Sequence, residues 1–295
     1  MVGKENASFG QEGKPDQYDP ELFVRRESEL NLIEAKVEQG RLNTAIDEPL
    51  VNFFGVGGNG KTWLMRRIQE KYRFSSDGTP VGDKPTVTIY FDCHEAEKEE
   101  AVQNFSTFLL SFAAILQKEL EAQLPASAIQ EEIKPLQQVD DTAVGLTKSL
   151  LSLSKKYVLI LLFDTTELIP SDLWPLLEKA LFEPLLESDR LILILSGRHY
   201  APRWRRVEVR RRAVYDHVQP FTKEMQQEQL AKLGVPEVTI FNQQLFPFTG
   251  GNPYLARQLT EVARSLKRDL EIRQNIEESE KFKNECLRIL RSYLN

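Results

Sequence analysis

The sequence predicts an α/β fold, in which a doubly wound and mostly parallel sheet of five strands is followed by a smaller helical domain. Up to residue 219, short apolar or β-branched runs alternate with helical patterns. Two of these runs, residues 157–163 and 191–195, are continuously apolar, which is typical of strands buried on both faces of a parallel sheet. From residue 220 onward, strand patterns largely disappear and helical patterns dominate.

The elements and their boundaries follow from the same patterns. The segments predicted as strands are, in chain order, residues 50–54, 86–91, 157–163, 191–195 and 212–218. Apolar side chains recur at helical spacing over residues 30–37, 63–68, 102–116, 144–153 and 173–186. We therefore predict a flexible N-terminal tail over residues 1–19, an α/β domain over 20–219 and a helical domain over 220–295.

The composition is that of a globular chain with an acidic balance. Of the 295 residues, 41% are hydrophobic and 28% are charged, and the formal net charge is −6. The negative charge disfavours a protein that wraps nucleic acid, although a local patch could still bind it. No apolar run approaches the roughly 20 residues of a membrane helix, and the polar N-terminus is unlike a secretory signal. We therefore expect a cytoplasmic protein without a membrane partner.

The segment between the first strand and the next helix carries the strongest functional signal. Residues 55–62 read Gly-Val-Gly-Gly-Asn-Gly-Lys-Thr and match the phosphate-binding pattern G-x-x-x-x-G-K-[ST]. The glycines let backbone N–H groups turn inward around a phosphate, and the helix N-terminus adds a partial positive charge. Lys61 would reach the β- and γ-phosphates, and the Thr62 hydroxyl would bind Mg²⁺. The alternative is a glycine-rich turn with an incidental lysine.

We predict that this P-loop and the start of its helix contact the nucleotide. The residues of this set are Gly55, Gly57, Gly58, Asn59, Gly60, Lys61, Thr62 and Trp63. No [NT]-K-x-D segment of the kind that reads guanine is present, so adenine is favoured as the base. The expected cofactors are therefore ATP or ADP together with Mg²⁺.

Polar residues at the ends of the third and fourth strands complete the predicted site, because ligands bind at the carboxyl ends of such strands. Asp164 follows the third strand and is expected to hold Mg²⁺, mostly through water; the alternative is a solvated turn. Glu167 could orient or deprotonate the water that attacks the γ-phosphate, or it could be a carboxylate stabilised at a helix N-terminus. Arg198 could sense the γ-phosphate, or it could be a surface arginine paired with a carboxylate.

Together these residues resemble the STAND class of P-loop ATPases, relatives of AAA+ and NB-ARC domains, over residues 22–259. Residues 23–30, Phe-Val-Arg-Arg-Glu-Ser-Glu-Leu, are similar to the entry motif F-V-G-R-E-x-E-L of that family. The resemblance implies that the backbone beside Val24 contacts adenine and that Arg26 is the family's nucleotide-site arginine. Arg25 stands where the family has glycine, and arginine adopts a positive φ less readily.

Four further segments carry the resemblance. Residues 164–167 are similar to the D-x-x-E Walker B variant, and residues 197–198 are similar to the sensor motif of the family. Residues 220–222 and 248–255 resemble the opening and the G-x-P segment of the helical lid, which implies that Pro253 packs near the base and the sugar. A simpler reading is a turn before a helix that has proline in its first turn; the two can both hold.

The resemblance also implies a function. Proteins of this class act as signal-transduction switches, in which ADP holds a closed monomer and ATP opens it and permits self-association. Hydrolysis is then expected to be slow, and the sensor and effector modules of such proteins are absent from this chain. Two alternatives stay open: an AAA+ ATPase that acts on DNA, and an interaction module that is locked by nucleotide and does not turn over.

The basic segment over residues 203–212 admits three interpretations. It contains six arginines. It could bind nucleic acid, with Trp204 stacking on a base, or it could supply arginine fingers to a neighbouring subunit. It could also be a solvated amphipathic segment whose Val207 and Val209 face the sheet.

Overall fold

The computed structural model describes residues 18–73, 85–98, 100, 102–125, 142–199, 204–236 and 238–272, with the side chains of residues 265–272 left aside. These residues form two compact units, one from residues 25–219 and the other from residues 18–24 together with 220–272. The segment over residues 20–24 therefore groups with the C-terminal helices, whereas the predicted boundaries placed it in the α/β domain. Most of the predicted N-terminal tail lies outside the described residues.

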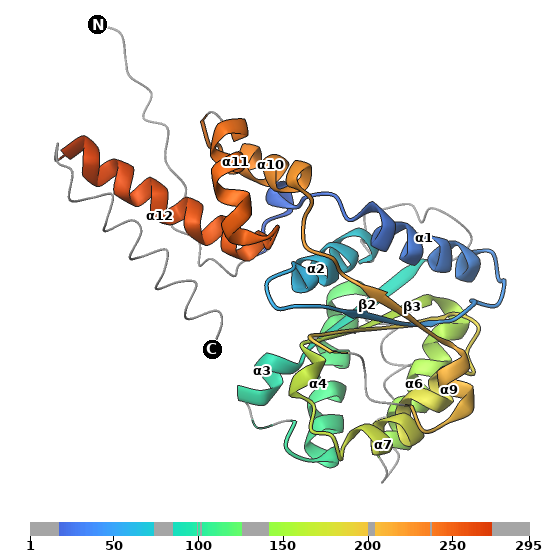
Figure 1. The fold of residues 1–295 in the computed structure, drawn as a ribbon. Coiled ribbons are helices and arrows are strands. Elements are labelled where there is room, and N and C mark those ends of the chain that lie inside the picture. The colour runs from blue at the N-terminus through green and yellow to red at the C-terminus, as the bar shows by residue number, and fades with distance from the viewer. Residues whose placement is uncertain are drawn as a thin grey trace, which may run out of the picture. The chain divides into compact units, whose positions relative to one another are not determined.

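The larger unit contains a five-stranded sheet in which every pairing is parallel (Figure 1). The strand order across the sheet is β2-β3-β4-β1-β5. The bounds of the strands are β1 Leu50–Phe54, β2 Thr86–Asp92, β3 Val158–Asp164, β4 Leu191–Gly197 and β5 Ala213–His217. The predicted α/β fold with a mostly parallel five-stranded sheet is confirmed.

Helices cover both faces of the sheet, as Figure 1 shows with the strands nearly edge-on. On one face lie α1 (Glu27–Arg41) and α2 (Lys61–Tyr72), and on the other lie α4 (Phe105–Gln123) and α6 (Thr142–Lys156). The shorter helical elements of this unit are α3 Cys93–Lys98, η2 Thr166–Leu168, α7 Trp174–Leu177, η3 Glu178–Phe182, α8 Glu183–Leu185 and α9 Val207–Arg211. The helix predicted over residues 173–186 is thus interrupted by a π-helical stretch, η3.

An aromatic cluster fixes the end of β3, where the predicted site begins. Phe163 is fully buried, and its ring centroid lies 5.6 Å from that of Phe91, 5.1 Å from that of Phe112 and 5.7 Å from that of Phe182. These partners come from β2, α4 and η3, so they hold the strand from several directions. Asp164 is the next residue, and its backbone is therefore fixed by packing.

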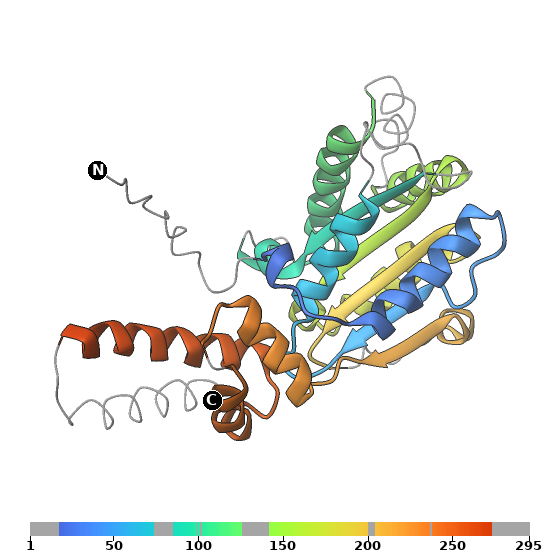
Figure 2. The same ribbon diagram turned by 90° about the horizontal axis from the view of Figure 1, so that it is seen from above.

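The smaller unit is helical and contains η1 (Pro20–Leu22), α10 (Lys223–Lys232), α11 (Val238–Thr249) and α12 (Pro253–Ile272) (Figure 2). Its apolar core is formed by Leu230, Leu245, Ala256 and Leu259. A buried polar network joins two helices, because Gln226 donates to Asn242 at 2.9 Å and accepts from Thr249 at 2.6 Å. Among the described residues of the whole chain, no helix has the length and apolarity that a membrane crossing needs.

Candidate nucleotide-binding site

The P-loop begins directly after β1, and its last two residues, Lys61 and Thr62, are the first two of α2, in the strand–loop–helix order that the sequence predicts. Gly55, Gly58 and Gly60 have positive φ values of 151°, 78° and 85°. A Cβ atom on Gly55 would lie only 2.7 Å from the carbonyl oxygen of Val218. A Cβ atom on Gly57 would lie 3.6 Å from the guanidinium carbon of Arg198. Gly55 therefore permits the close approach of the loop to the end of β5, whereas a Cβ atom at Gly57 would make only an ordinary contact.

Lys61 lies at the centre of the site. Its side chain is largely buried, and its Nζ donates hydrogen bonds to the carbonyl oxygens of Gly55 at 2.7 Å and Val56 at 3.0 Å. Burial lowers the pKa of Lys61, and the charges of Glu167 and Asp164 oppose that change. The ammonium group thus lies within electrostatic range of both predicted acidic residues, while Thr62 is exposed in the first turn of α2.

Asp164 is buried and held by two hydrogen bonds at the end of β3. Its Oδ1 accepts from the backbone N–H of Thr165 at 2.9 Å, and its Oδ2 accepts from the Tyr90 hydroxyl at 2.8 Å. Thr165 has a φ of 56°, a left-handed conformation that is strained for a β-branched residue. The Tyr90 ring in turn lies 3.6 Å from the guanidinium of Arg66. The carboxylate is therefore fixed in orientation before any ligand is considered.

Glu167 and Arg198, which the sequence proposes for hydrolysis and sensing, form an ion pair. Glu167 lies in η2, and its Oε1 is 3.2 Å from Nε of Arg198. Its Oε2 accepts from the backbone N–H of Arg198 at 3.2 Å. A Cβ atom on Gly197 would lie 2.6 Å from Oγ1 of Thr166 and 3.2 Å from Oε2 of Glu167. Only a glycine before Arg198 lets η2 approach the end of β4 this closely.

A further acidic residue, Asp92, lies beside Asp164 and was missed from the sequence. The two aspartates are paired in register at the ends of β2 and β3. Burial raises the pKa of Asp92, and the neighbouring charge of Asp164 raises it further. Arg66 Nη2 lies 3.9 Å from the Asp92 carboxylate. The signal was available, because Asp92 directly follows an apolar strand, as Asp164 does.

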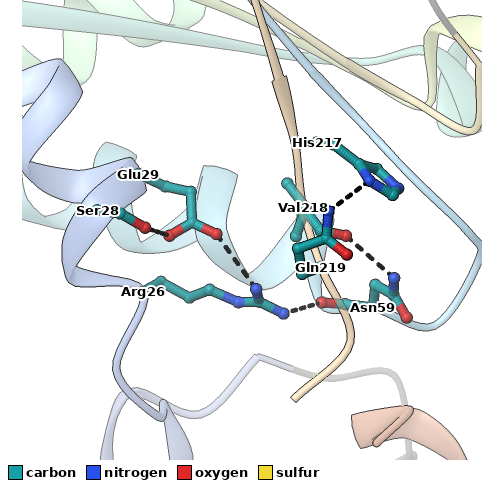
Figure 3. Close-up of polar contacts among 7 residues, drawn as sticks. All are labelled: Arg26, Ser28, Glu29, Asn59, His217, Val218 and Gln219. Atoms are coloured by element: carbon teal, nitrogen blue, oxygen red, sulfur yellow. Dashed lines mark hydrogen bonds and ion pairs between the residues drawn. The ribbon is translucent and has the colours of Figure 1, made fainter. Parts of the chain in front are cut away.

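The entry motif contacts the P-loop through Arg26. Both Arg25 and Arg26 have positive φ values, 45° and 71°, so the arginine that stands where the family has glycine adopts a left-handed backbone. The buried guanidinium of Arg26 donates to the carbonyl oxygen of Asn59 at 2.7 Å and pairs with Glu29 at 3.2 Å (Figure 3). Burial lowers the pKa of Arg26, and the charge of Glu29 opposes that change.

The two lid segments of the resemblance contact each other in the helical unit. The backbone N–H of Phe221 donates to the carbonyl oxygen of Gly251 at 2.7 Å. Asn252 caps α12 by accepting from the backbone N–H of Leu255 at 3.0 Å, and Pro253 is buried at the first position of that helix. Val24 is also buried and belongs to this same unit. The nucleotide contacts predicted for Val24 and Pro253 stay predictions.

The structure agrees with only part of what was expected of the basic segment over residues 203–212. Trp204 is buried and packs edge-on against Trp174 and Phe182, so it is not available for stacking on a base, and that part of the hypothesis is wrong. Val209 is fully buried, whereas Val207 is 46% exposed and does not face the sheet. The backbone N–H groups of Arg205 and Arg206 donate to the Glu178 carboxylate at 3.0 Å and 2.7 Å. Arg203 lies outside the described residues.

The donors at this edge of the sheet fit a magnesium nucleotide. In the described part of the chain, no group of three or more His, Cys, Asp or Glu side chains could hold a metal ion. Magnesium in nucleotide sites commonly takes one or two protein ligands and completes its shell with water and phosphate oxygens. The hydroxyl of Thr62 and the carboxylate of Asp164 would supply such a pair, and Lys61 would supply the positive charge for the phosphates.

Comparison with solved structures finds the same fold in other proteins. The chain is similar to Cdc6p from Pyrobaculum aerophilum, at 16% identity and a TM-score of 0.57 over 92% of this chain and 70% of that chain. A Walker-type ATPase of Pyrococcus abyssi matches at 18% identity and a TM-score of 0.53, over 92% of this chain and 76% of that one. The chain therefore shares the fold of these two proteins, with a parallel five-stranded sheet and a P-loop after β1.

A third structure with this fold is the Orc1 protein of Aeropyrum pernix, which was solved in complex with DNA. It matches at 17% identity and a TM-score of 0.53, over 90% of this chain and 66% of that chain. No family model matches the sequence, and no curated protein matches it either. The likeness therefore concerns the fold alone, because one fold can carry many functions.

Proposed function

We propose that this chain binds ATP and ADP with Mg²⁺ at the P-loop and hydrolyses ATP. The observation that carries the proposal is the convergence of Lys61, Asp164 and Glu167 at the carboxyl ends of β1 and β3, beside a glycine-rich loop at a helix N-terminus. In an AAA+-type fold this is the position where phosphoryl chemistry takes place. The proposed substrate class is an adenine nucleoside triphosphate.

Each residue of the proposed site has a separate task. Lys61 would leave its carbonyl partners at Gly55 and Val56 to contact the β- and γ-phosphates. Thr62 and Asp164 would hold the magnesium ion, which neutralises charge on the phosphates when bound. Tyr90 keeps the Asp164 carboxylate in its orientation. Most of the catalysis expected from such a site is positioning and electrostatic stabilisation.

The Glu167–Arg198 pair supports a joint role for the two residues. The carboxylate of Glu167 would orient or deprotonate the attacking water, and Arg198 would respond to the charge of the γ-phosphate. Their ion pair holds the Arg198 guanidinium next to Gly57 of the loop. The side chain of Arg198 is 66% exposed, so it can change partner without a large cost in buried contacts.

We further propose that ATP and ADP states control opening and self-association, as in a cytoplasmic signalling switch of the STAND type. The support is the order of the motifs along the chain and the contact between the two lid segments at Phe221 and Gly251. Slow hydrolysis is part of this proposal, because a switch needs long-lived states. In this proposal Val24 and Pro253 contact the base and the sugar from the helical unit.

A second candidate function is an ATPase that acts on DNA. It is favoured by the exposed arginines 210 and 211 on α9 and by the fold shared with an Orc1 protein that was solved with DNA. The acidic net charge of −6 and the burial of Trp204 weigh against it. DNA-stimulated hydrolysis, together with binding that weakens steeply with salt, would favour this candidate over the switch.

The experiment that tests the proposal compares the purified protein with the variant Lys61→Ala. Each is denatured, the released nucleotide is identified by chromatography, and binding of ATP with Mg²⁺ is titrated separately. We expect the wild type to bind adenine nucleotide and the variant to lose at least about 100-fold in affinity, because a charge-assisted contact to phosphate is removed. A wild type that neither carries nor binds nucleotide would refute the proposal. Bound nucleotide without phosphate release would favour the locked interaction module.

A further inference from the structure

Asn59 occupies a variable position of the P-loop pattern, yet it is one of the most constrained residues of the loop. It is 1% exposed. Its backbone carbonyl oxygen accepts from Arg26 at 2.7 Å, and its side-chain Nδ2 donates to the carbonyl oxygen of Val218 at 3.0 Å (Figure 3). One residue of the loop therefore contacts two segments that are far away in the sequence.

Those two segments are the places where the chain passes between its two units. The chain enters the larger unit at Arg25 and leaves it after Gln219. Arg26 is the residue after the first connection, and Val218 lies just before the second. Both covalent connections to the helical unit are thus tied to Asn59, each by one buried hydrogen bond.

The second connection is anchored to the base of the P-loop by further contacts. The backbone N–H of Val218 donates to the carbonyl oxygen of Phe54 at 2.8 Å. The ring of His217 stacks on that of Phe54 at a centroid distance of 4.9 Å, and Nε2 of Gln219 lies 2.6 Å from Nδ1 of His217. These contacts fix the chain through Val218, so the bond from Asn59 lies where the fixed strand becomes the connection.

The backbone is strained at the first connection and at the residue after it. Arg25 and Arg26 are both left-handed without being glycine, and such a conformation needs surrounding contacts to hold it. The contacts of the Arg26 guanidinium with Asn59 and Glu29 are among those that do so. A small shift of the Asn59 peptide would therefore change the support of both connections at once.

We propose that Asn59 is a positioning residue that couples the state of the phosphate loop to both connections leading to the helical unit. The proposal rests on the proposed nucleotide site, since phosphate binding is what would fix the loop backbone. A phosphate held by the loop N–H groups orients the peptides of residues 57–60. Asn59 then presents its carbonyl oxygen to Arg26 and its amide to Val218 in one arrangement, which favours one geometry of each connection.

The test measures amide hydrogen exchange of the full chain over residues 22–30 and 214–224, with and without ADP and Mg²⁺. In the wild type we expect ADP to slow exchange of both segments. Asn59→Asp keeps the carbonyl for Arg26 but turns a donor into an acceptor facing Val218. In the wild type we expect ADP to slow exchange over 214–224 about tenfold, the equilibrium value of one buried hydrogen bond. Asn59→Asp should therefore abolish the ADP effect over 214–224 and retain the effect over 22–30. Arg26→Ala should produce the reverse pattern.

The control is Asn52→Ala, which removes the same amide from a buried position on β1. Neither side-chain polar atom of Asn52 has a hydrogen-bond partner among the described residues, so this variant should leave both ADP effects unchanged. If Asn59→Asp keeps the full ADP effect over 214–224, or if Asn52→Ala loses it too, the coupling role is wrong.

Failure of the proposed function gives a different result. If the wild type does not bind nucleotide in a direct titration, the nucleotide site is wrong and the hydrogen bonds are judged in the nucleotide-free protein. There Asn59→Asp should speed exchange over 214–224 relative to 22–30, and Arg26→Ala should do the opposite. Equal exchange in all proteins would overturn the role of Asn59 as well.

Discussion

Two adjacent glycines of the lid segment have opposite surroundings, and this predicts opposite tolerance to alanine. Gly251 has a φ of 79°, and a Cβ atom there would lie 2.0 Å from the carbonyl oxygen of Phe221. Gly250 also has a positive φ, 55°, but an added Cβ would meet no atom within 4 Å. Alanine at either position would therefore have a strained left-handed backbone, but only at Gly251 would it also cause a steric clash.

The expected cost follows from these terms. Gly250→Ala should destabilise the helical unit by only about 0.5–1 kcal/mol, because left-handed strain is partly offset by the smaller entropy of the unfolded alanine chain. Gly251→Ala places a carbon about 1.5 Å inside the optimal separation of non-bonded heavy atoms. Overpacking and loss of the 2.7 Å bond from Phe221 to Gly251 raise its cost to roughly 3–5 kcal/mol.

The measurement is equilibrium urea unfolding of the full chain, with Gly250→Ala as the matched control for Gly251→Ala. We expect a clearly lower midpoint for the second variant and a small change for the first. Equal midpoints would mean that the close approach of residues 221 and 251 does not exist in solution. The proposed role of the lid segment in nucleotide binding would then have to rest on Pro253 alone.

Two further predictions concern the acidic residues of the site. Glu167→Gln should retain nucleotide affinity but lower single-turnover phosphate release by roughly 100-fold or more, as loss of a general base does; unchanged release would assign hydrolysis to another group. Asp92 has a raised pKa in the folded state, so its contribution to stability is lost as pH rises through that pKa. Asp92→Asn should therefore be more stable than the wild type at pH 7, with a gain that shrinks towards pH 4; a pH-independent difference in urea midpoint would contradict the assignment.

The sheet could be predicted because its signals are local. The apolar runs that end at Phe163 and Leu195 need both faces covered, and the structure places helices on both faces of the sheet they form. The P-loop could be predicted for the same reason, because its pattern is only eight residues long and its backbone geometry requires glycines. Such features are set by neighbours along the chain, and composition and spacing record them directly.

Contacts between segments that are distant in the sequence cannot be predicted from local patterns in this way. The burial of Trp204 depends on Trp174 and Phe182, which the chain brings to it only when folded. Asp92 becomes part of the site because β2 pairs with β3 in a register that aligns it with Asp164. Periodicity gives the faces of a strand but not its partner or its register. Trp204 was therefore misassigned, and the place of Asp92 at the end of a strand did not by itself show that it lies beside Asp164.

The fixed and variable positions of the P-loop pattern differ in what they specify. In the proposed site Gly60 and Lys61 would serve the phosphate and Thr62 the magnesium ion, as the pattern requires of any chain with this chemistry. Asn59 is not required by phosphate, and its amide is directed at Val218 instead. An amide there costs stability when it lacks a partner, because it is buried. Its bond to Val218 therefore ties the loop to the end of β5, and the variable position is where this chain links a common loop to its own architecture.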